Sequence, residues 1–134
     1  DVPVTFSSTD YASSKVEVEL QKLCQALSLT PEQIRDKWGK DIIFAGLNKD
    51  GSLNTTSTAN EPGHWFDVNG NVCVWGEEAK VYSELDKENF IFKVGQYPGH
   101  CKIGEFYTIK QSFVYEYETG RKVQAVFKFN ITIR

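Results

Sequence analysis

The chain is 134 residues long, with 25% of its residues charged and a formal net charge of −3. This length suffices for one domain with its own hydrophobic core, and we expect residues 1–134 to form a single domain. The slight negative charge offers no basic surface for a phosphate backbone, which excludes nucleic acid as the expected partner. No apolar run approaches the roughly 20 residues that span a bilayer, so we expect no membrane span.

The sequence contains no methionine and three cysteines. We expect that Asp1 is not a native translation start and that the chain was processed or excised from something longer, which leaves room for a removed signal peptide. Three cysteines allow at most one intramolecular bridge. We favour Cys24 and Cys73 as small buried hydrophobic residues, with a disulfide between Cys73 and Cys101 as the alternative. The cysteines lack paired metal-ligand spacing, and we expect no metal and no cofactor.

The first elements expected along the chain are a short strand and a helical hairpin. Residues 2–6 (VPVTF) alternate in hydrophobicity, and Pro3 places this strand at a sheet edge or at a strand start. In the helical hairpin, expected over about 14–38, Ser14 and Glu17 have the spacing of a capping box. The apolar residues that then recur at helical spacing are Val16, Leu20, Leu23 and Leu27.

The second helix of the hairpin has the stronger start signals. Thr30, Pro31 and Gln33 stand where the N-cap, the first and the third helical residues are expected, and they form a capping box. Gly39 supplies the expected stop. Residues 28–30 leave only a short connection, so the two helices are predicted to be antiparallel neighbours.

From residue 42 onward the sequence is typical of strands separated by Gly, Asn, Asp and Pro. This β-rich part is expected over about 41–134. Long alternating strands need a cover for their apolar face, and the apolar stripe of the helices needs a sheet. We therefore predict an α+β fold in which the helical hairpin packs on a mainly antiparallel β-sheet or β-sandwich. The candidate strands are 42–47, 64–68, 72–75, 79–85, 90–94, 106–117 and 122–133.

The register of the last hairpin follows from its apolar positions. Residues 123–133 alternate between apolar and polar, and the preceding strand is rich in aromatic residues. A two-residue turn would put these aromatic residues on the solvent side, whereas a three-residue loop over 118–120 puts both apolar sets on one face. We predict the three-residue loop, with Gly120 in the left-handed conformation. The residues grouped on that face include Phe113, Tyr115, Val123, Ala125 and Phe127.

Residues 62–76 (PGHWFDVNGNVCVWG) predict another hairpin, centred on an Asn-Gly pair. Asn-Gly favours a two-residue turn, but a three-residue loop over 68–70 separates the two faces better, and we predict that loop. It groups Phe66, Val68, Val72 and Val74 on one face and Trp65, Asp67, Cys73 and Trp75 on the other. If the second face is open, it presents an aromatic surface beside a carboxylate. If another element covers it, Trp65 is core.

Several segments of the chain resemble a known domain family. They are DKWG (36–39), ANEPGHWFDVNGNVCVWG (59–76), KVGQYPG (93–99) and the closing strands FVYEY and VFKFNITI. Together they resemble a domain family of unknown function from secreted and surface-anchored Bacteroidetes proteins, in which such domains are linked to glycan capture and breakdown. The resemblance implies an exported location, whether extracellular, at the cell surface or periplasmic. It also implies a non-catalytic accessory role beside the neighbouring domains of a larger surface protein, and it implies no particular binding residue.

The residues offer little support for an enzyme. His64 and Asp67 could pair as a base and its orienting group, and His100 adjoins Cys101. However, adjacent residues of a strand point to opposite faces, and the sequence has neither a Gly-x-Ser-x-Gly elbow nor a set of metal ligands. We therefore expect no catalytic activity and assign no catalytic residue.

Two non-enzymatic hypotheses remain open. The first is weak carbohydrate binding, in which sugar rings stack on aromatic side chains while polar side chains bind the hydroxyl groups. The second is a structural or protein-interaction spacer without a small-molecule ligand, in which the same aromatic residues are buried. An exposed, coplanar aromatic pair favours the first hypothesis and full burial favours the second. The candidate ligand-binding residues are Trp65, Asp67, Trp75, Gln96 and Tyr97.

Overall fold

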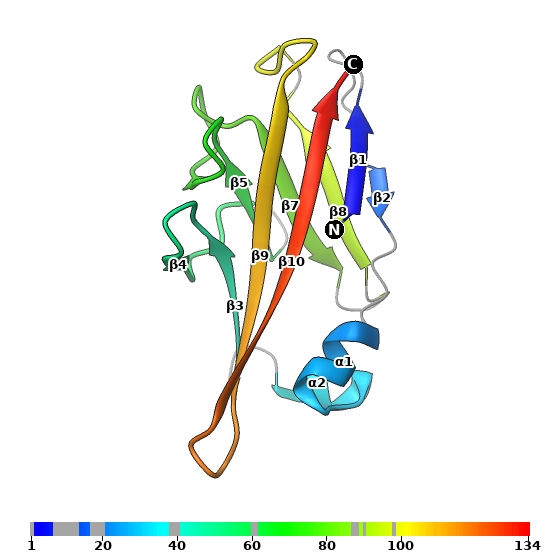
Figure 1. Cartoon of the computed structure of the whole chain (residues 1–134), viewed down its shortest axis with the longest axis vertical. Coiled ribbons are helices and arrows are strands. Elements are labelled where there is room, and N and C mark those ends of the chain that lie inside the picture. Colours follow the sequence, from blue (N-terminus) through cyan, green and yellow to red (C-terminus); the bar gives the residue numbers. More distant parts are fainter. Residues whose placement is uncertain are drawn as a thin grey trace.

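A computed structural model describes residues 2–6, 14–16, 21–37, 41–59, 62–86, 89, 91–97 and 99–134. Two five-stranded sheets pack face to face in a β-sandwich (Figure 1). The first sheet has the order β1 (Val2–Phe6), β10 (Lys122–Ile133), β9 (Phe106–Glu116), β3 (Ile42–Leu47) and β4 (Leu53–Asn54). The second has the order β2 (Ser14–Val16), β8 (Ile91–Gln96), β7 (Val81–Asp86), β5 (Gly63–Phe66) and β6 (Val72–Cys73). The described strand pairs are antiparallel except that of β1 with β10, which is parallel.

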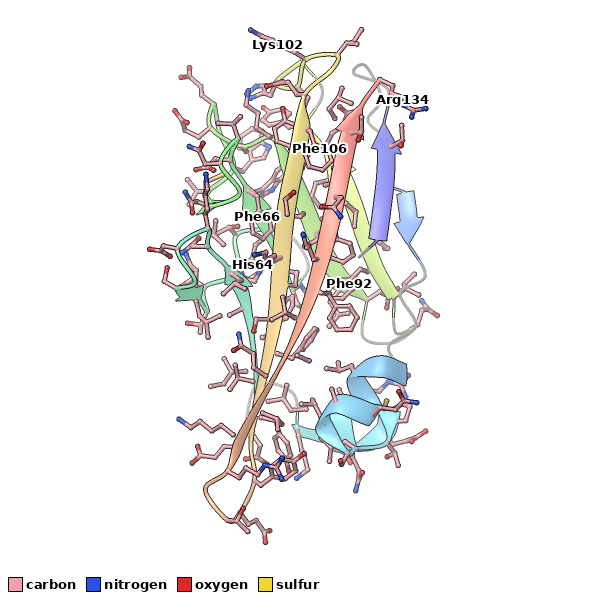
Figure 2. The ribbon with its side chains drawn as sticks, in the orientation of Figure 1. His64, Phe66, Phe92, Lys102, Phe106 and Arg134 are labelled. Carbon is pink, nitrogen blue, oxygen red and sulfur yellow. The ribbon has the colours of Figure 1, made fainter. Side chains whose placement is uncertain are left out.

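Phenylalanine rings from both sheets meet in the core between them. The ring centroid of Phe92, on β8, lies 6.0 Å from that of Phe113 on β9 and 5.2 Å from that of Phe129 on β10. All three side chains are fully buried. In Figure 2, Phe92 lies between the sheets, as does Phe66 of β5. The inner face of each sheet therefore covers the inner face of the other.

Two short helices lie at one end of the sandwich, beside the far part of the β9–β10 hairpin (Figure 1). They are α1 (Gln21–Leu27) and α2 (Pro31–Lys37). Leu23, Leu27 and Ile34 bury their side chains in the same core as the sheets. The hydroxyl group of Tyr117 donates a hydrogen bond to the carbonyl oxygen of Leu27 at 2.7 Å, which ties α1 to the hairpin. Neither described helix is long and apolar enough to cross a membrane.

The predicted α+β fold is wrong, because the protein is mainly β. Each helix has only seven residues. The apolar face of each sheet is covered by the other sheet and not by a helical hairpin, as the contacts between phenylalanine rings across the core show. The strands from β5 to β8 form a layer of their own, and that layer removes the need for a helical cover. The helices close one end of the sandwich instead.

The predicted start of the first helix at Ser14 is also wrong. Residues 14–16 form β2, which pairs with β8 so that Lys15 stands opposite Lys93. The segment SKVEVEL (14–20) is apolar at every second position, which is typical of a strand, and its valines favour extended backbone. Of the predicted stripe, Leu20 lies outside the described residues.

The predicted start of α2 is confirmed. The backbone N–H of Gln33 donates to Oγ1 of Thr30 at 3.2 Å, and the backbone N–H of Thr30 donates to Oε1 of Gln33 at 2.9 Å. These reciprocal bonds are the capping box that the sequence predicts. The predicted stop at Gly39 lies outside the described residues.

The predicted register of the last hairpin is confirmed. Val123 stands opposite Tyr115, and Ala125 stands opposite Phe113. The N–H of Tyr117 donates to the carbonyl oxygen of Arg121 at 2.8 Å, which leaves residues 118–120 as the loop. Gly120 has a φ of 84°, the left-handed conformation that this loop requires.

Candidate functional site

The β5–β6 hairpin adopts the predicted three-residue loop. Trp65 stands opposite Cys73, and Gly70 has a φ of 81° while its N–H donates to the carbonyl oxygen of Asp67 at 3.0 Å. This register turns Phe66 into the core, where it is fully buried, and turns Trp65 to the outer face of the second sheet. That face is covered by no other described sheet.

Aromatic side chains continue across this outer face. Trp65 pairs with Tyr82 of β7, and their ring centroids lie 4.7 Å apart. Tyr82 in turn pairs with Gly95 of β8. A Cβ atom at position 95 would occupy the space that the Tyr82 ring fills. The glycine therefore lets this ring lie flat against the neighbouring strand.

The residues after β6 and β8 extend the surface. The ring of Tyr97 lies 5.7 Å from that of Trp65 and 5.5 Å from that of Trp75, measured between centroids, and the planes of Tyr97 and Trp75 differ by 18°. The His100 ring stacks on Tyr97 at 3.8 Å. Trp75 is 62% exposed, whereas Trp65 and Tyr97 are half-buried. We call the five residues Trp65, Trp75, Tyr82, Tyr97 and His100 the aromatic patch.

Three of the five predicted ligand-binding residues, Trp65, Trp75 and Tyr97, thus come together. Asp67 lies on the same face, but its carboxylate accepts hydrogen bonds within the hairpin loop. Its Oδ1 accepts the backbone N–H groups of Asn69 at 2.9 Å and Asn71 at 3.0 Å. Asp67 therefore holds the loop that positions Trp65.

Gln96 does not join the aromatic patch. It pairs with Val81, faces the interior and is 3% exposed. Phe92, Val94 and Gln96 occupy alternate positions of β8 and share its inner face, so Tyr97 has to face outward. The prediction that Gln96 and Tyr97 share a surface is wrong for this reason.

Tyr82 and His100 belong to the aromatic patch although they were not among the predicted ligand-binding residues. The alternation of Val81, Ser83 and Leu85 could have placed Tyr82 on the outer face, because all three are buried. Its pairing with Trp65 joins β7 to β5, which are not consecutive in the chain because β6 lies between them. For His100, we find no signal in the sequence.

Two asparagines hold the hairpin against the first sheet. Oδ1 of Asn48, just after β3, accepts the N–H of Val72 at 2.7 Å, and Oδ1 of Asn71 accepts the N–H of Lys49 at 2.9 Å. These reciprocal bonds link the edges of the two sheets. They fix the position of the β5–β6 hairpin, which carries Trp65, relative to the end of β3.

His64 lies on the opposite face of β5 from Asp67, within a buried polar network between the sheets. Its Nδ1 atom is 2.9 Å from Oε1 of Gln111, on β9. Nε2 of Gln111 donates to the carbonyl oxygen of Ser83, on β7, at 3.2 Å and also contacts the Ser83 hydroxyl. His64, Gln111 and Ser83 are each at most 1% exposed. This network joins the two sheets, and it does not bring His64 and Asp67 together as a catalytic pair.

The network determines which ring nitrogen of His64 carries a proton. A carbonyl oxygen can only accept, so the side-chain amide of Gln111 must point its NH₂ group at Ser83 and its oxygen at His64. Nδ1 of His64 therefore donates. Burial lowers the pKa of His64 below its ordinary value, while Gln111 and the backbone of Asn54 act in the opposite direction. The neutral ring thus has its proton on Nδ1.

The lowered pKa of His64 predicts a loss of stability in mild acid. Because the unfolded chain has a histidine pKa near 6.5, it binds more protons than the folded chain below that pH. The free energy of unfolding should fall as the pH drops from about 6.5, by at most about 1.4 kcal/mol per pH unit, until the folded-state pKa is reached. Urea denaturation across this range measures the slope.

The matched variant for this prediction is His64→Asn. Its neutral amide can still donate to Gln111 but does not titrate. We expect a smaller slope between about pH 5 and pH 6.5 in this variant than in the parent chain. Equal slopes in the two proteins would show that His64 does not titrate differently on folding.

The cysteines carry free thiols, so the alternative disulfide between Cys73 and Cys101 is not formed. Burial, and then the charges of Asp67 and Glu78, raise the pKa of Cys73 to about 11. A thiol with such a pKa is a poor nucleophile at neutral pH. Within the described ranges, no three His, Cys, Asp or Glu side chains gather as a metal site would require.

A family model for a domain of unknown function, DUF4859, matches residues 10–121. The chain belongs to the DUF4859 family. The DUF4859 match contains the whole aromatic patch and the His64, Gln111 and Ser83 network. It excludes β1 and β10, which pair with each other in the first sheet. Comparisons with curated proteins and with solved structures find no match for this DUF4859 chain.

Proposed function

We propose that the chain is a non-catalytic accessory domain that binds carbohydrate weakly through its aromatic patch. The observation that carries this proposal is the exposure of Trp75, 62% of whose surface is open while its ring stacks on Tyr97. Trp75 extends a contiguous surface of aromatic rings, and contiguous exposed apolar surfaces mark binding sites more often than single exposed residues do. The flat CH face of a sugar ring fits such a surface.

The surroundings of the aromatic patch supply groups that suit sugar hydroxyls. Glu77 and Glu78 are exposed and follow Trp75 in the chain, separated from it by Gly76. Nδ1 of His100 lies 3.2 Å from the carbonyl oxygen of Glu77, which keeps this segment beside the stacked rings. Carboxylates accept hydrogen bonds from hydroxyl groups, and such bonds orient a ligand that stacking alone leaves free to rotate.

The resemblance noted in the sequence extends the proposal to location and context. We infer an exported domain of a Bacteroidetes surface protein that takes part in glycan capture, beside other domains of a larger chain. A shallow surface on a small domain binds one sugar segment at millimolar to micromolar affinity, which corresponds to a binding free energy of about 4–8 kcal/mol. Weak binding is sufficient when several modules act on one polysaccharide.

Replacing Trp75 with alanine tests the proposal. We expect the affinity for the bound polysaccharide to fall at least about tenfold, because the most exposed ring of the aromatic patch is lost. Stability should change by no more than about 0.5 kcal/mol, since the ring is largely exposed. A glycan array identifies the ligand, and titration followed by tryptophan fluorescence measures the affinity.

Phe106→Ala is the matched control. Phe106 is also an exposed aromatic residue, 58% exposed, but it stands at the start of β9 in the other sheet (Figure 2). This variant should bind carbohydrate as the parent chain does. If no polysaccharide on the array binds, or if Trp75→Ala and Phe106→Ala bind equally well, the spacer hypothesis replaces the carbohydrate hypothesis.

A further inference from the structure

Two exposed carboxylates lie at one margin of the aromatic patch. Glu77 and Glu78 come shortly after Trp75, whose ring is 62% exposed. The contact between Nδ1 of His100 and the carbonyl oxygen of Glu77 holds this segment beside the stacked rings of His100 and Tyr97. A ligand that covers Trp75 therefore has both glutamates as neighbours.

The hairpin that carries Trp65 adds a third carboxylate, that of Asp67. Burial, and then the negative charges of Asp67 and Glu78, raise the pKa of the Cys73 thiol. Cys73 stands directly opposite Trp65 in the β5–β6 hairpin. Because screened charges act strongly only over short distances, both carboxylates lie close to the strands that carry the Trp65 ring.

Lys80 brings a positive charge to the same region, but groups of the protein hold it. Its Nζ atom donates to the carbonyl oxygen of His100. Its charge also reaches Glu105. Burial alone would raise the pKa of Glu105, but hydrogen bonds from Tyr107 and the backbone of Lys102, together with the charges of Lys80 and Lys102, lower it. Lys80 is thus partly neutralised within the protein, and negative charge is in excess among the described residues around the aromatic patch.

Aromatic rings and carboxylates favour the same kind of ligand. The face of a tryptophan or tyrosine ring carries partial negative charge and attracts cations. Carboxylates also attract cations, and they repel anions. A sugar with a protonated amino group suits both, because its CH face can stack while its ammonium group lies beside the carboxylates. A sugar acid would bring like charges together.

We infer that the aromatic patch prefers carbohydrate with free, unacetylated amino groups over neutral and acidic carbohydrate. This inference rests on the proposed carbohydrate binding and adds the charge of the ligand to it. The sugar ring covers Trp75 and Tyr97, and its ammonium groups lie beside Glu77 and Glu78. The affinity therefore has an electrostatic part, which salt weakens.

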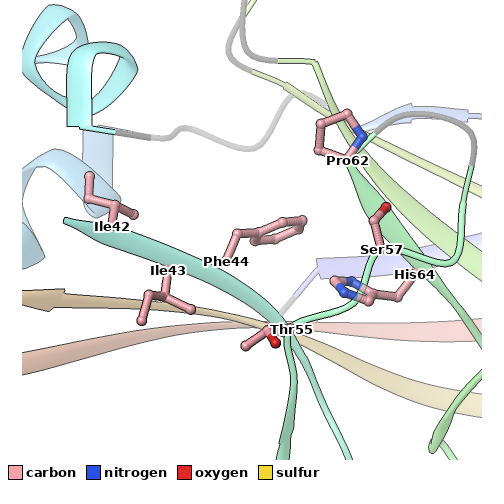
Figure 3. A pocket seen from close by; sticks show the side chains of 7 residues that line it. All are labelled: Ile42, Ile43, Phe44, Thr55, Ser57, Pro62 and His64. Atoms are coloured by element: carbon pink, nitrogen blue, oxygen red, sulfur yellow. The ribbon is translucent and has the colours of Figure 1, made fainter. Parts of the chain in front are cut away.

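A cleft between β3 and the segment that leads into β5 offers no such selection (Figure 3). Its volume is about 300 Å³, and its walls include Ile42, Phe44 and Pro62, with no carboxylate among the described residues that line it. An ammonium group placed there would lose water without gaining a charged partner. A preference for amino sugars therefore reports on the aromatic patch and not on this cleft.

The test compares oligosaccharides from cellulose, chitin and chitosan, which share one backbone and are used at equal length. They differ in a single substituent of each sugar, which is a hydroxyl, an acetamido or an amino group. The full chain is titrated in mildly acidic buffer of low ionic strength, in which the amino groups are protonated, and tryptophan fluorescence reports binding. We expect the chitosan oligosaccharide to bind about fivefold more tightly than the other two. The difference should vanish at about 1 M salt, where the Debye length falls to about 3 Å.

Two double variants with the same change in net charge locate this preference. Glu77→Gln with Glu78→Gln removes the carboxylates beside Trp75 and should reduce the preference to less than about twofold. Glu116→Gln with Glu118→Gln removes two exposed carboxylates at the far end of the β9–β10 hairpin (Figure 1) and should leave the preference unchanged.

The outcomes separate this inference from the proposed function. Equal affinity for the three oligosaccharides, or tighter binding of a neutral or acidic glycan than of the chitosan oligosaccharide, overturns the inference and leaves carbohydrate binding in place. A preference that falls equally in both double variants also overturns it, because the net charge of the chain and not the aromatic patch then attracts the ligand. If neither these oligosaccharides nor any glycan on the array binds, the proposed function itself fails, and the inference fails with it.

Discussion

Replacing Phe92 with alanine is expected to lower the free energy of unfolding by about 3–5 kcal/mol. Phe92 is fully buried, and its ring contacts rings from β9 and β10 of the opposite sheet. The substitution removes apolar contact on every side and leaves a cavity, because packed cores relax only in part. Urea denaturation should show a lower midpoint with little change in the slope m.

Phe106→Ala provides the comparison for this prediction as well. The same ring is removed, but from a side chain that is 58% exposed. We expect a change within about 0.5 kcal/mol. If the two substitutions cost the same, the two sheets do not share the core described here.

Replacing Gln111 with leucine should cost about 3 kcal/mol, although leucine is more apolar and similar in size. The substitution leaves Nδ1 of His64 buried without the oxygen that accepts its proton, and it removes the hydrogen bond from Gln111 to the carbonyl oxygen of Ser83. A buried group left without its partner costs about 1–3 kcal/mol. The free energy of unfolding in urea again measures the loss.

A double-mutant cycle separates this cause from simple repacking. His64→Phe replaces the other large partner by an apolar ring, so that His64→Phe with Gln111→Leu removes donor and acceptor together. Removing both partners of a buried hydrogen bond costs less stability than removing one and leaving the other buried without a partner. The double variant should therefore lose less stability than the two single variants added together. Additive losses would mean that the two side chains do not interact.

The turns of both hairpins were predictable because their signals are local. In the last hairpin the alternation of the two strands agrees with only one loop length, and in the β5–β6 hairpin it favours the three-residue loop over the two-residue turn that Asn-Gly suggests. In both, a glycine stands where the loop needs a left-handed residue. Gly70 and Gly120 both adopt this conformation. The start of α2 was predictable for a similar reason, since Thr30 and Gln33 satisfy each other within one turn. Interactions between residues close in sequence need no knowledge of the remaining chain.

The start of the first helix was not predictable, because residues 14–20 fit two patterns. Val16 and Leu20 have a helical spacing of four, but they also belong to a strict alternation in SKVEVEL. The choice depends on whether a strand edge is available for pairing. The edge of β8 supplies the hydrogen bonds to β2, and a partner 78 residues away, as in the pairing of Lys15 with Lys93, leaves no local signal.

The residues of the candidate site also divide into those that the sequence could place and those that it could not. Alternation alone placed Trp65 and Asp67 on one face, and it could have placed Gln96 in the interior with Phe92 and Val94. Alternation could not show that Tyr82 pairs with Trp65. In the chain β6 lies between β5 and β7, but in the sheet it lies on the far side of β5. The polar network was equally hidden, since Gln111 stands 47 positions from His64 in the chain.

The sequence by itself thus determined β1 and, apart from β4, the strands after residue 42, together with the two hairpin loops and the cap of α2. These features arise from side-chain alternation and from hydrogen bonds within a few residues. Only the tertiary structure decided that a second sheet, and not a helical hairpin, covers the first, that Trp75 remains exposed beside Tyr97, and that His64 meets Gln111 between the two sheets. Those outcomes depend on which distant surfaces meet, and burial is a property of the assembled layers that no short segment contains.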